Sequence, residues 1–233
     1  MSIKLYDLAG IDDRRFSSNC WRTRFALLHK GLPHITVPKL FTSIHKISGD
    51  NHRTLPIITD GKTTISDSWA IVNYLEAAYP HKPSLFDKQD SLKSYSEFLQ
   101  HWSLKAISFP LLQIIIKDIY DRLDPIDKPY FRATREKRFG KTLEDIVKNS
   151  EDNVEQFRSG LNPLRVSLKH RNFLSGKKPL YPDYIIAAAL MWPRSMSPKQ
   201  ILHEDDTLNT WFKTMLSLYE GIGSKQPKEW VGI

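Results

Sequence analysis

The sequence predicts two unlike units: an α/β domain over residues 1–80 and an all-helical domain over residues 89–233, joined by a linker at residues 81–88. Three observations support this division. Strand and helix patterns alternate up to Pro80, that residue and Pro83 then interrupt the periodicity, and no strand-like alternation follows Gln89. Both units have the size of ordinary domains.

The first part of the α/β unit is expected to form a strand, a helix and a second strand. The evidence is apolar residues at strand or helix spacing, namely Ile3 and Leu5, then Trp21, Phe25 and Leu28, then Ile35 and Val37. Gly31 and Pro33 are typical of the residues just beyond a helix C-terminus, so the helix should end there.

A hairpin and a second helix complete this unit. Pro56–Thr59 and Lys62–Ile65 read as two strands joined by a two-residue Asp60-Gly61 turn. The polar run Ser66–Ser68 then opens a helix that should end at Tyr79-Pro80.

Beyond the linker the spacing of apolar residues predicts helices only. Pro110 should kink or end the first of them, because proline disrupts a helix interior. The expected helices contain Leu92 to Ala106, Leu111 to Ile119, Phe131 to Ile146, Val154 to Leu168, Asp183 to Met191, and Trp211 to Tyr219.

Composition limits the class of protein. With 40% hydrophobic and 26% charged residues the chain can fill a core, and a single cysteine excludes an intrachain disulfide or a four-cysteine zinc site. The longest apolar run, Tyr184–Trp192, is far shorter than the ~20 residues of a membrane span. The N-terminus has no signal-peptide pattern. We therefore expect a cytoplasmic protein that does not enter a membrane.

The net charge of +8 raises the question of nucleic-acid binding. The excess is spread over both units, and no zinc-finger or RNP-type motif accompanies it, so we expect no nucleic-acid partner. The densest basic stretch, Arg132–Lys141, is interpreted as a solvated helix face. No histidine pair has metal-ligand spacing, so no metal is expected. An acidic small molecule would also suit the charge.

Two helix N-termini and one loop could carry chemistry. Ser17, Ser18 and Asn19 stand where the first helix begins, and Asp67 and Ser68 stand where the second begins; helix N-termini favour anions. These side chains are equally suited to plain helix capping. Between these helix N-termini lies the segment Thr54-Leu55-Pro56, in which a cis peptide bond would expose the Leu55 backbone to a ligand.

The order of these elements resembles thioredoxin-like domains. Leu55-Pro56 followed by Asp67-Ser68-x-Ala70-Ile71-x-x-Tyr74-Leu75 resembles the glutathione-site signature of the glutathione transferase superfamily, whose members continue into an all-helical domain. The resemblance implies that Pro56 is cis, that Leu55 pairs its backbone with the cysteinyl part of glutathione, and that Asp67 and Ser68 bind the γ-glutamyl group.

The chain is most similar to the fungal etherase-like (FuA) class and the related bacterial β-etherases. The matching stretches are Ser17-x-Asn19-x-Trp21-Arg22-Thr23-Arg24, Thr54–Ile58, Ile65–Ser68 and Tyr130–Glu144. This resemblance implies Ser17 as the catalytic residue, Asn19 as a glutathione contact, and Arg53 as the partner of the glycine carboxylate. Ser18 replaces the proline of the class, and Leu180 replaces the serine or threonine that usually caps a core helix before Asp183.

The expected reaction is attack by glutathione, the co-substrate, on an electrophile, a peroxide or an aryl ether. Lowering its thiol pKa from ~8.5 by about 2 units needs about 2.7 kcal/mol. A hydroxyl donor stabilises the thiolate by about 1.5–3 kcal/mol, and a helix N-terminus by about 0.3–1 kcal/mol. Cys20 could instead form an adduct, although packing in the helix is its ordinary role.

The hydrophobic or aromatic second substrate is expected between the domains, against Tyr95–Ser103 and Ile116–Tyr120. Two alternatives stay open: a ligandin-like binder of aromatic molecules, and a non-enzymatic interaction protein on the same fold. The family also implies a homodimer.

Overall fold

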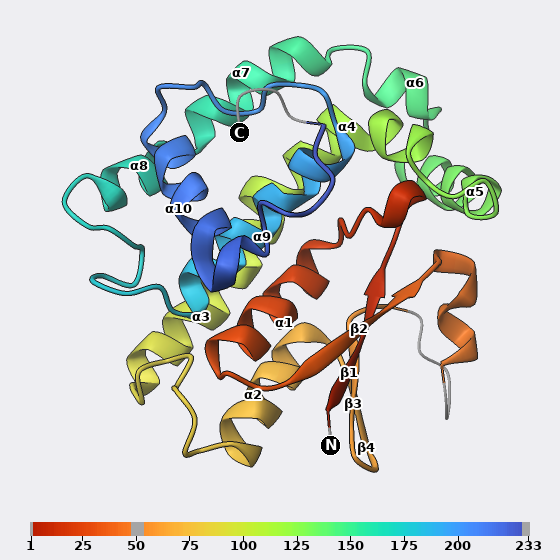
Figure 1. Cartoon of the computed structure of the whole chain (residues 1–233). Coiled ribbons are helices and arrows are strands. Elements are labelled where there is room, and N and C mark those ends of the chain that lie inside the picture. Colours follow the sequence, from red (N-terminus) through yellow and green to blue (C-terminus); the bar gives the residue numbers. More distant parts are fainter. Residues whose placement is uncertain (1, 48–53, 230–233) are drawn as a thin grey trace.

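The computed structural model describes residues 2–47 and 54–229, and its first unit is built on one sheet (Figure 1). The strands are β1 (Ile3–Leu8), β2 (His34–Lys39), β3 (Ile57–Asp60) and β4 (Thr63–Ser66), in the order β2-β1-β3-β4. β1 runs parallel to β2 and antiparallel to β3, and β3 and β4 form the hairpin. This arrangement confirms the predicted thioredoxin-like unit.

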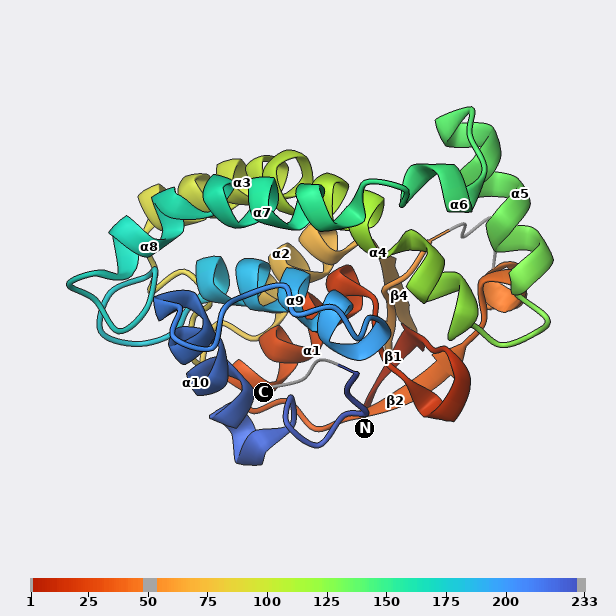
Figure 2. The same ribbon diagram turned by 90° about the horizontal axis from the view of Figure 1, so that it is seen from above.

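The two long helices of this unit, α1 (Ser18–His29) and α2 (Ser68–Ala78), lie between the sheet and the helical unit (Figures 1 and 2). Two short 3-10 helices, η1 (Ile11–Asp13) and η2 (Phe41–Lys46), follow β1 and β2. Trp21 and Phe25 of α1 are buried, as are Ile71 and Leu75 of α2, so the predicted apolar faces of both helices are confirmed.

The hairpin turn lies one residue later than predicted. Asp60 pairs with Thr63, so the two loop residues are Gly61 and Lys62. Gly61 has a φ of 58°, and a glycine with positive φ at the first loop position suits a type II′ turn. The Asp60 carboxylate accepts hydrogen bonds from the hydroxyls of Tyr74 and Tyr79, which hold this residue at the end of β3.

The second unit contains helices and no strand among its described residues, as the sequence predicts. Its long helices are α3 (Asp90–Ser103), α4 (Phe109–Asp121), α5 (Lys128–Phe139), α7 (Ser150–Gly160), α9 (Tyr181–Met196) and α10 (Thr207–Gly221). α9 is central: it contacts α1, α3 and α4, and Trp192 is its one residue that is not buried. Within residues 2–47 and 54–229, every helix is too short or too polar to traverse a bilayer.

The first helix of this unit is broken before Pro110, as expected. A π-helical segment, η3 (Leu104–Ser108), separates α3 from α4, and Pro110 occupies the first turn of α4. The predicted apolar stripe of α3 is partly wrong, because Tyr95 is 39% exposed while Ser96 and Ser103 are buried. These small side chains let α3 approach the central helix closely.

Two helices predicted as continuous are each split in two. Gly140, with a φ of 66°, caps α5, and a new short helix, α6 (Leu143–Ile146), begins after the Thr142 cap. The other break separates α7 from α8 (Asn162–Leu168), where Pro163 stands in the first turn of the new helix. Apolar spacing continued across both breaks, so periodicity alone concealed them.

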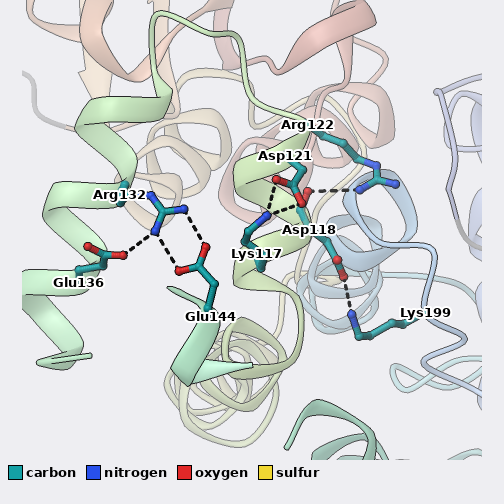
Figure 3. Close-up of polar contacts among 8 residues, drawn as sticks. All are labelled: Lys117, Asp118, Asp121, Arg122, Arg132, Glu136, Glu144 and Lys199. Atoms are coloured by element: carbon teal, nitrogen blue, oxygen red, sulfur yellow. Dashed lines mark hydrogen bonds and ion pairs between the residues drawn. The ribbon is translucent and has the colours of Figure 1, made fainter. Parts of the chain in front are cut away.

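Part of the basic stretch on α5 is paired rather than simply solvated. Arg132 donates to Glu136 and makes two bonds with Glu144 of the short helix α6, which is thereby fastened to α5 (Figure 3). Hydrogen bonding to Arg132 lowers the pKa of Glu144 to about 2. Figure 3 also shows Lys199 reaching Asp118 of α4, at 2.9 Å.

Buried polar contacts join the two units. Asp127, which is fully buried just before α5, accepts bonds from the Phe41 and Thr42 backbone N–H groups at 2.7 and 2.9 Å. It also accepts from the Thr42 hydroxyl at 2.8 Å. These bonds cap η2 from the helical unit. They therefore fix the segment of the first unit that precedes the Leu55-Pro56 loop.

Candidate active site

A cavity of about 670 Å³ lies between the two units, where α1 and α2 begin. One wall comes from the first unit and consists of Ser18, Asn19, Arg22, Asp67, Ser68 and Trp69. The facing wall comes from α3, η3, the first turns of α4, and single residues of α5 and α9. The structure thus brings together Ser18, Asn19, Asp67 and Ser68, which are far apart in the sequence.

At the N-terminus of α1 the Ser17 side chain caps the helix. Its Oγ accepts a hydrogen bond from the Cys20 backbone N–H at 3.3 Å, as the capping interpretation predicted. Ser17 is half-buried and does not line the cavity, whereas Ser18 and Asn19 do. Both of these residues belong to the first turn of α1, whose N–H groups lack helical acceptors. The cavity therefore has hydrogen-bond donors at this helix end.

At the N-terminus of α2, Asp67 has an unusual backbone. Its φ of 81° and ψ of 130° lie outside the regions that side-chain-bearing residues favour, a costly geometry that clusters at functional sites. Its Oδ1 accepts from the backbone N–H groups of Trp69 and Ala70 at 2.9 and 3.0 Å. Asp67 is exposed, and no hydrogen bond to its Oδ2 is found among the described residues. Ser68, beside it, is buried and lines the same cavity.

The loop before β3 adds backbone groups. The Leu55-Pro56 peptide bond is cis, as the resemblance implied, and both residues are buried. The Asp67 N–H donates to the Pro56 carbonyl at 3.2 Å, which ties this loop to the start of α2. Among the residues that the structure describes, no hydrogen bond to the Leu55 N–H or carbonyl is found. Arg53 lies outside the described residues.

Arg22 is a cavity residue that the sequence reasoning missed as a site residue. It is 6% exposed, its Nη2 donates to the Ser103 hydroxyl at 3.3 Å, and its Nε has no partner among the described residues. Burial lowers its pKa, while the nearby Tyr181 and Asp67 favour its charged form. The four-residue spacing between Ser18 and Arg22 could have indicated this position, because residues i and i+4 share a helix face.

The facing wall differs from the expected second-substrate wall. Glu97, Gln100 and His101 of α3 do line the cavity. None of Ile116–Tyr120 does, because Ile116 and Ile119 are buried in the helical core. α4 contributes Phe109 and Leu112 from its beginning instead. The wall also carries two cations, Lys105 and Arg138.

Cys20 is fully buried behind the N-terminus of α1. Burial and the neighbouring Asp7 carboxylate raise the pKa of its thiol well above the usual value. The thiol is therefore protonated at neutral pH and poorly placed to act as a nucleophile, which favours its role as a packed helix residue.

The helix that begins at Tyr181 compensates for its missing cap. The buried Asp183 carboxylate accepts from the backbone N–H groups of Leu174, Ser175 and Leu180, at 2.7, 3.2 and 3.2 Å. Leu180 itself offers no side-chain acceptor. Asp183 therefore holds the chain leading into α9, the central helix on which α1 packs.

A thioredoxin-like unit followed by a helical unit is the fold of glutathione transferases, and comparison with known proteins agrees. Residues 13–83 match the glutathione S-transferase N-terminal domain and residues 95–218 match the C-terminal domain. The chain belongs to the glutathione S-transferase family.

Its relatives include several fungal proteins. It is 26% identical to the glutathione S-transferase-like protein ustS of Aspergillus flavus, covering 93% of this chain and 89% of the relative. The crystal structure of glutathione transferase GSTFuA3 from Phanerochaete chrysosporium superposes with a TM-score of 0.75 at 29% identity, covering 97% and 94% of the two chains. A Ceriporiopsis subvermispora glutathione S-transferase in complex with glutathione gives 0.73 at 27% identity, covering 97% and 95%.

Proposed function

We propose that this protein binds glutathione at the neighbouring N-termini of α1 and α2 and transfers the glutathionyl group, through its sulfur, to an electrophile. The observation that carries the proposal is the convergence of two helix N-termini, an exposed carboxylate residue and a buried guanidinium on one cavity. Glutathione has a matching set of groups: an ammonium, two carboxylates and a thiol. The structural relative that was crystallised with glutathione supports the same ligand.

The γ-glutamyl group is proposed to bind at the start of α2. The Asp67 oxygen that does not cap the helix, Oδ2, suits the ammonium, since charge-assisted bonds are the stronger ones. The α-carboxylate suits the Ser68 hydroxyl and the helix N-terminus, with the Arg22 guanidinium as a nearby positive charge.

The rest of glutathione extends along the first unit in this proposal. The cysteinyl part pairs with the Leu55 backbone beside Pro56, and Asn19 contributes at the start of α1. Arg53 is proposed to hold the glycine carboxylate.

Ser17 is proposed to donate a hydrogen bond from its hydroxyl group to the glutathione thiolate. When its Oγ accepts from the Cys20 N–H, the hydroxyl hydrogen stays available for another acceptor. Ser18 is the competing donor because it lines the cavity. With an electrophile or an aryl ether the sulfur–carbon bond forms, the leaving group departs with its electron pair, and the thiol proton passes to water. With a peroxide the sulfur attacks one oxygen, the O–O bond breaks and an alcohol or water leaves; a second glutathione thiol then displaces water from the sulfenic acid to give glutathione disulfide. Aryl ethers and peroxides are the proposed substrate classes beside simple electrophiles.

Substitution of Asp67 tests the binding site. Asp67→Ala should weaken glutathione binding by about 1.5–3 kcal/mol, the scale of a hydrogen bond to a charged group. Asp67→Asn separates charge from capping, because asparagine also caps helices and tolerates positive φ. Calorimetry should therefore show weaker binding in Asp67→Asn, with a melting temperature close to that of the wild type. Unchanged glutathione affinity in both variants would contradict the proposed site.

A further inference from the structure

The helical wall of the cavity carries two cations, each beside one of two stacked aromatic rings. The Phe109 and Phe139 rings have centroids 5.9 Å apart with an interplanar angle of 30°. The Lys105 Nζ lies 6.0 Å from the centre of the Phe109 ring, and the Arg138 Cζ lies 5.9 Å from that of the Phe139 ring. We call Lys105, Phe109, Arg138 and Phe139 the cationic rim. Three of its members, all but Phe139, line the cavity.

The charges of the cationic rim are not neutralised by the protein. In the described part of the chain, no carboxylate forms an ion pair with Lys105 or Arg138, and both side chains are exposed. This contrasts with Arg132 on the same helix as Arg138, which is held by two glutamates. The two cations are therefore free to pair with an anion from solution.

The rim is separate from the residues proposed for glutathione. Lys105 and Arg138 lie on η3 and α5 of the helical unit, whereas the glutathione groups lie on the first unit. The acidic residue on the same wall, Glu97, precedes Lys105 by eight residues, a rise of about 12 Å along a helix. Opposite charges are thus set apart along the wall, with the positive end beside an exposed aromatic ring.

We propose that the second substrate of this protein is a planar aromatic anion, such as an aryl carboxylate, whose charge is held by Lys105 and Arg138. The ring would lie against Phe109, which is 38% exposed, and above the apolar Leu112 and Trp192. Two cations beside a flat apolar surface suit this class better than a neutral hydrocarbon, because the neutral molecule leaves both charges unused. The inference rests on the proposed function, because it specifies the second-substrate class for the same cavity.

Binding of two matched probes tests this substrate class without requiring turnover. Calorimetry with 2-naphthoate and 2-naphthamide compares an anion with a neutral molecule of nearly the same shape, in the presence and absence of saturating glutathione. We expect naphthoate to bind about tenfold more tightly, which is about 1.4 kcal/mol and within reach of two exposed ion pairs. The preference should shrink as ionic strength rises.

The double variant Lys105→Gln/Arg138→Gln should lose this preference and keep its glutathione affinity. Lys128→Gln is the matched control, because Lys128 is an α5 cation 5.5 Å from the Tyr120 ring and outside the cavity lining. Equal binding of both probes to the wild type, or an unaltered preference in the double variant, would overturn the inference. So would a loss of glutathione affinity in the double variant, since the rim would then serve glutathione itself.

The same measurements keep the two proposals apart. If glutathione fails to bind while the naphthoate preference is present and disappears in the double variant, the proposed function is wrong and the anionic site stands. If glutathione binds normally and the two naphthalene probes bind equally, the anionic site is wrong and the glutathione site stands.

Discussion

Replacement of Ser17 by alanine removes two interactions that can be measured separately. Its Oγ caps α1 at 3.3 Å from the Cys20 nitrogen, and loss of such a cap costs about 1 kcal/mol of stability. For a chain of this length that lowers the melting temperature by about 2–4 °C. Loss of the proposed hydrogen bond to the thiolate reduces the stabilisation of the bound anion by a further amount of about 1.5–3 kcal/mol.

The kinetic consequence is a turnover about 10- to 100-fold lower at neutral pH, because less of the bound thiol is ionised. The pH–rate profile should shift to higher pH, and glutathione affinity should change little, since the γ-glutamyl contacts remain. The assay is initial-rate kinetics against pH, using a substrate found in a panel of electrophiles, peroxides and aryl ethers.

Three further variants decide what a slow Ser17→Ala enzyme means. Ser17→Gly also lacks the hydroxyl but costs only a few tenths of a kcal/mol as a cap, so it should be equally slow and more stable. If Ser18→Ala abolishes turnover while Ser17→Ala does not, Ser18 is the catalytic serine. If neither matters and Cys20→Ser is inactive, the reaction proceeds through a mixed disulfide and the proposed mechanism is wrong.

Three other outcomes are expected. Asp127→Ala leaves the Phe41 and Thr42 amides unsatisfied, which should lower the free energy of unfolding by about 2–5 kcal/mol and the melting temperature by about 5–15 °C. An unchanged melting temperature would contradict a stabilising role for these bonds. Burial lowers the pKa of His29 below its usual 6.5, so the unfolded chain binds the proton more strongly. Its contribution to stability should be present above pH 6.5 and decline as pH falls through the folded pKa, and His29→Gln should flatten that decline in melting curves. Light scattering should give twice the 27.1 kDa chain mass for the proposed homodimer; a monomer mass would exclude it.

The pH prediction depends on the contacts of His29. Its Nε2 lies 3.0 Å from the Ser84 carbonyl oxygen, so this nitrogen must carry the hydrogen. The other ring nitrogen lies 2.8 Å from the Tyr184 hydroxyl and accepts from it. Lys30 and Lys178 oppose protonation, while Glu76 favours it. A neutral ring therefore satisfies both neighbours, and a charged one does not.

Local patterns in the sequence determined the element order and the family. Strand and helix periods differ, so the order of strands and helices could be read directly, and the Asp67-Ser68 pair stood at a helix N-terminus because such residues cap helices. The helix breaks at Gly140 and Pro163 carried local signals too, yet apolar spacing ran across them. Weighing caps and prolines above periodicity would have found both.

The composition of the cavity was decided only by the tertiary structure. Arg22, Lys105 and Arg138 are ordinary helix residues in the sequence, and they line one cavity only because α1, η3 and α5 are packed around it. Likewise, Asp127 resembles any loop aspartate until its carboxylate meets η2. Sequence spacing determines which residues share a helix face, whereas the packing of distant helices determines which faces meet, and that packing depends on the whole core.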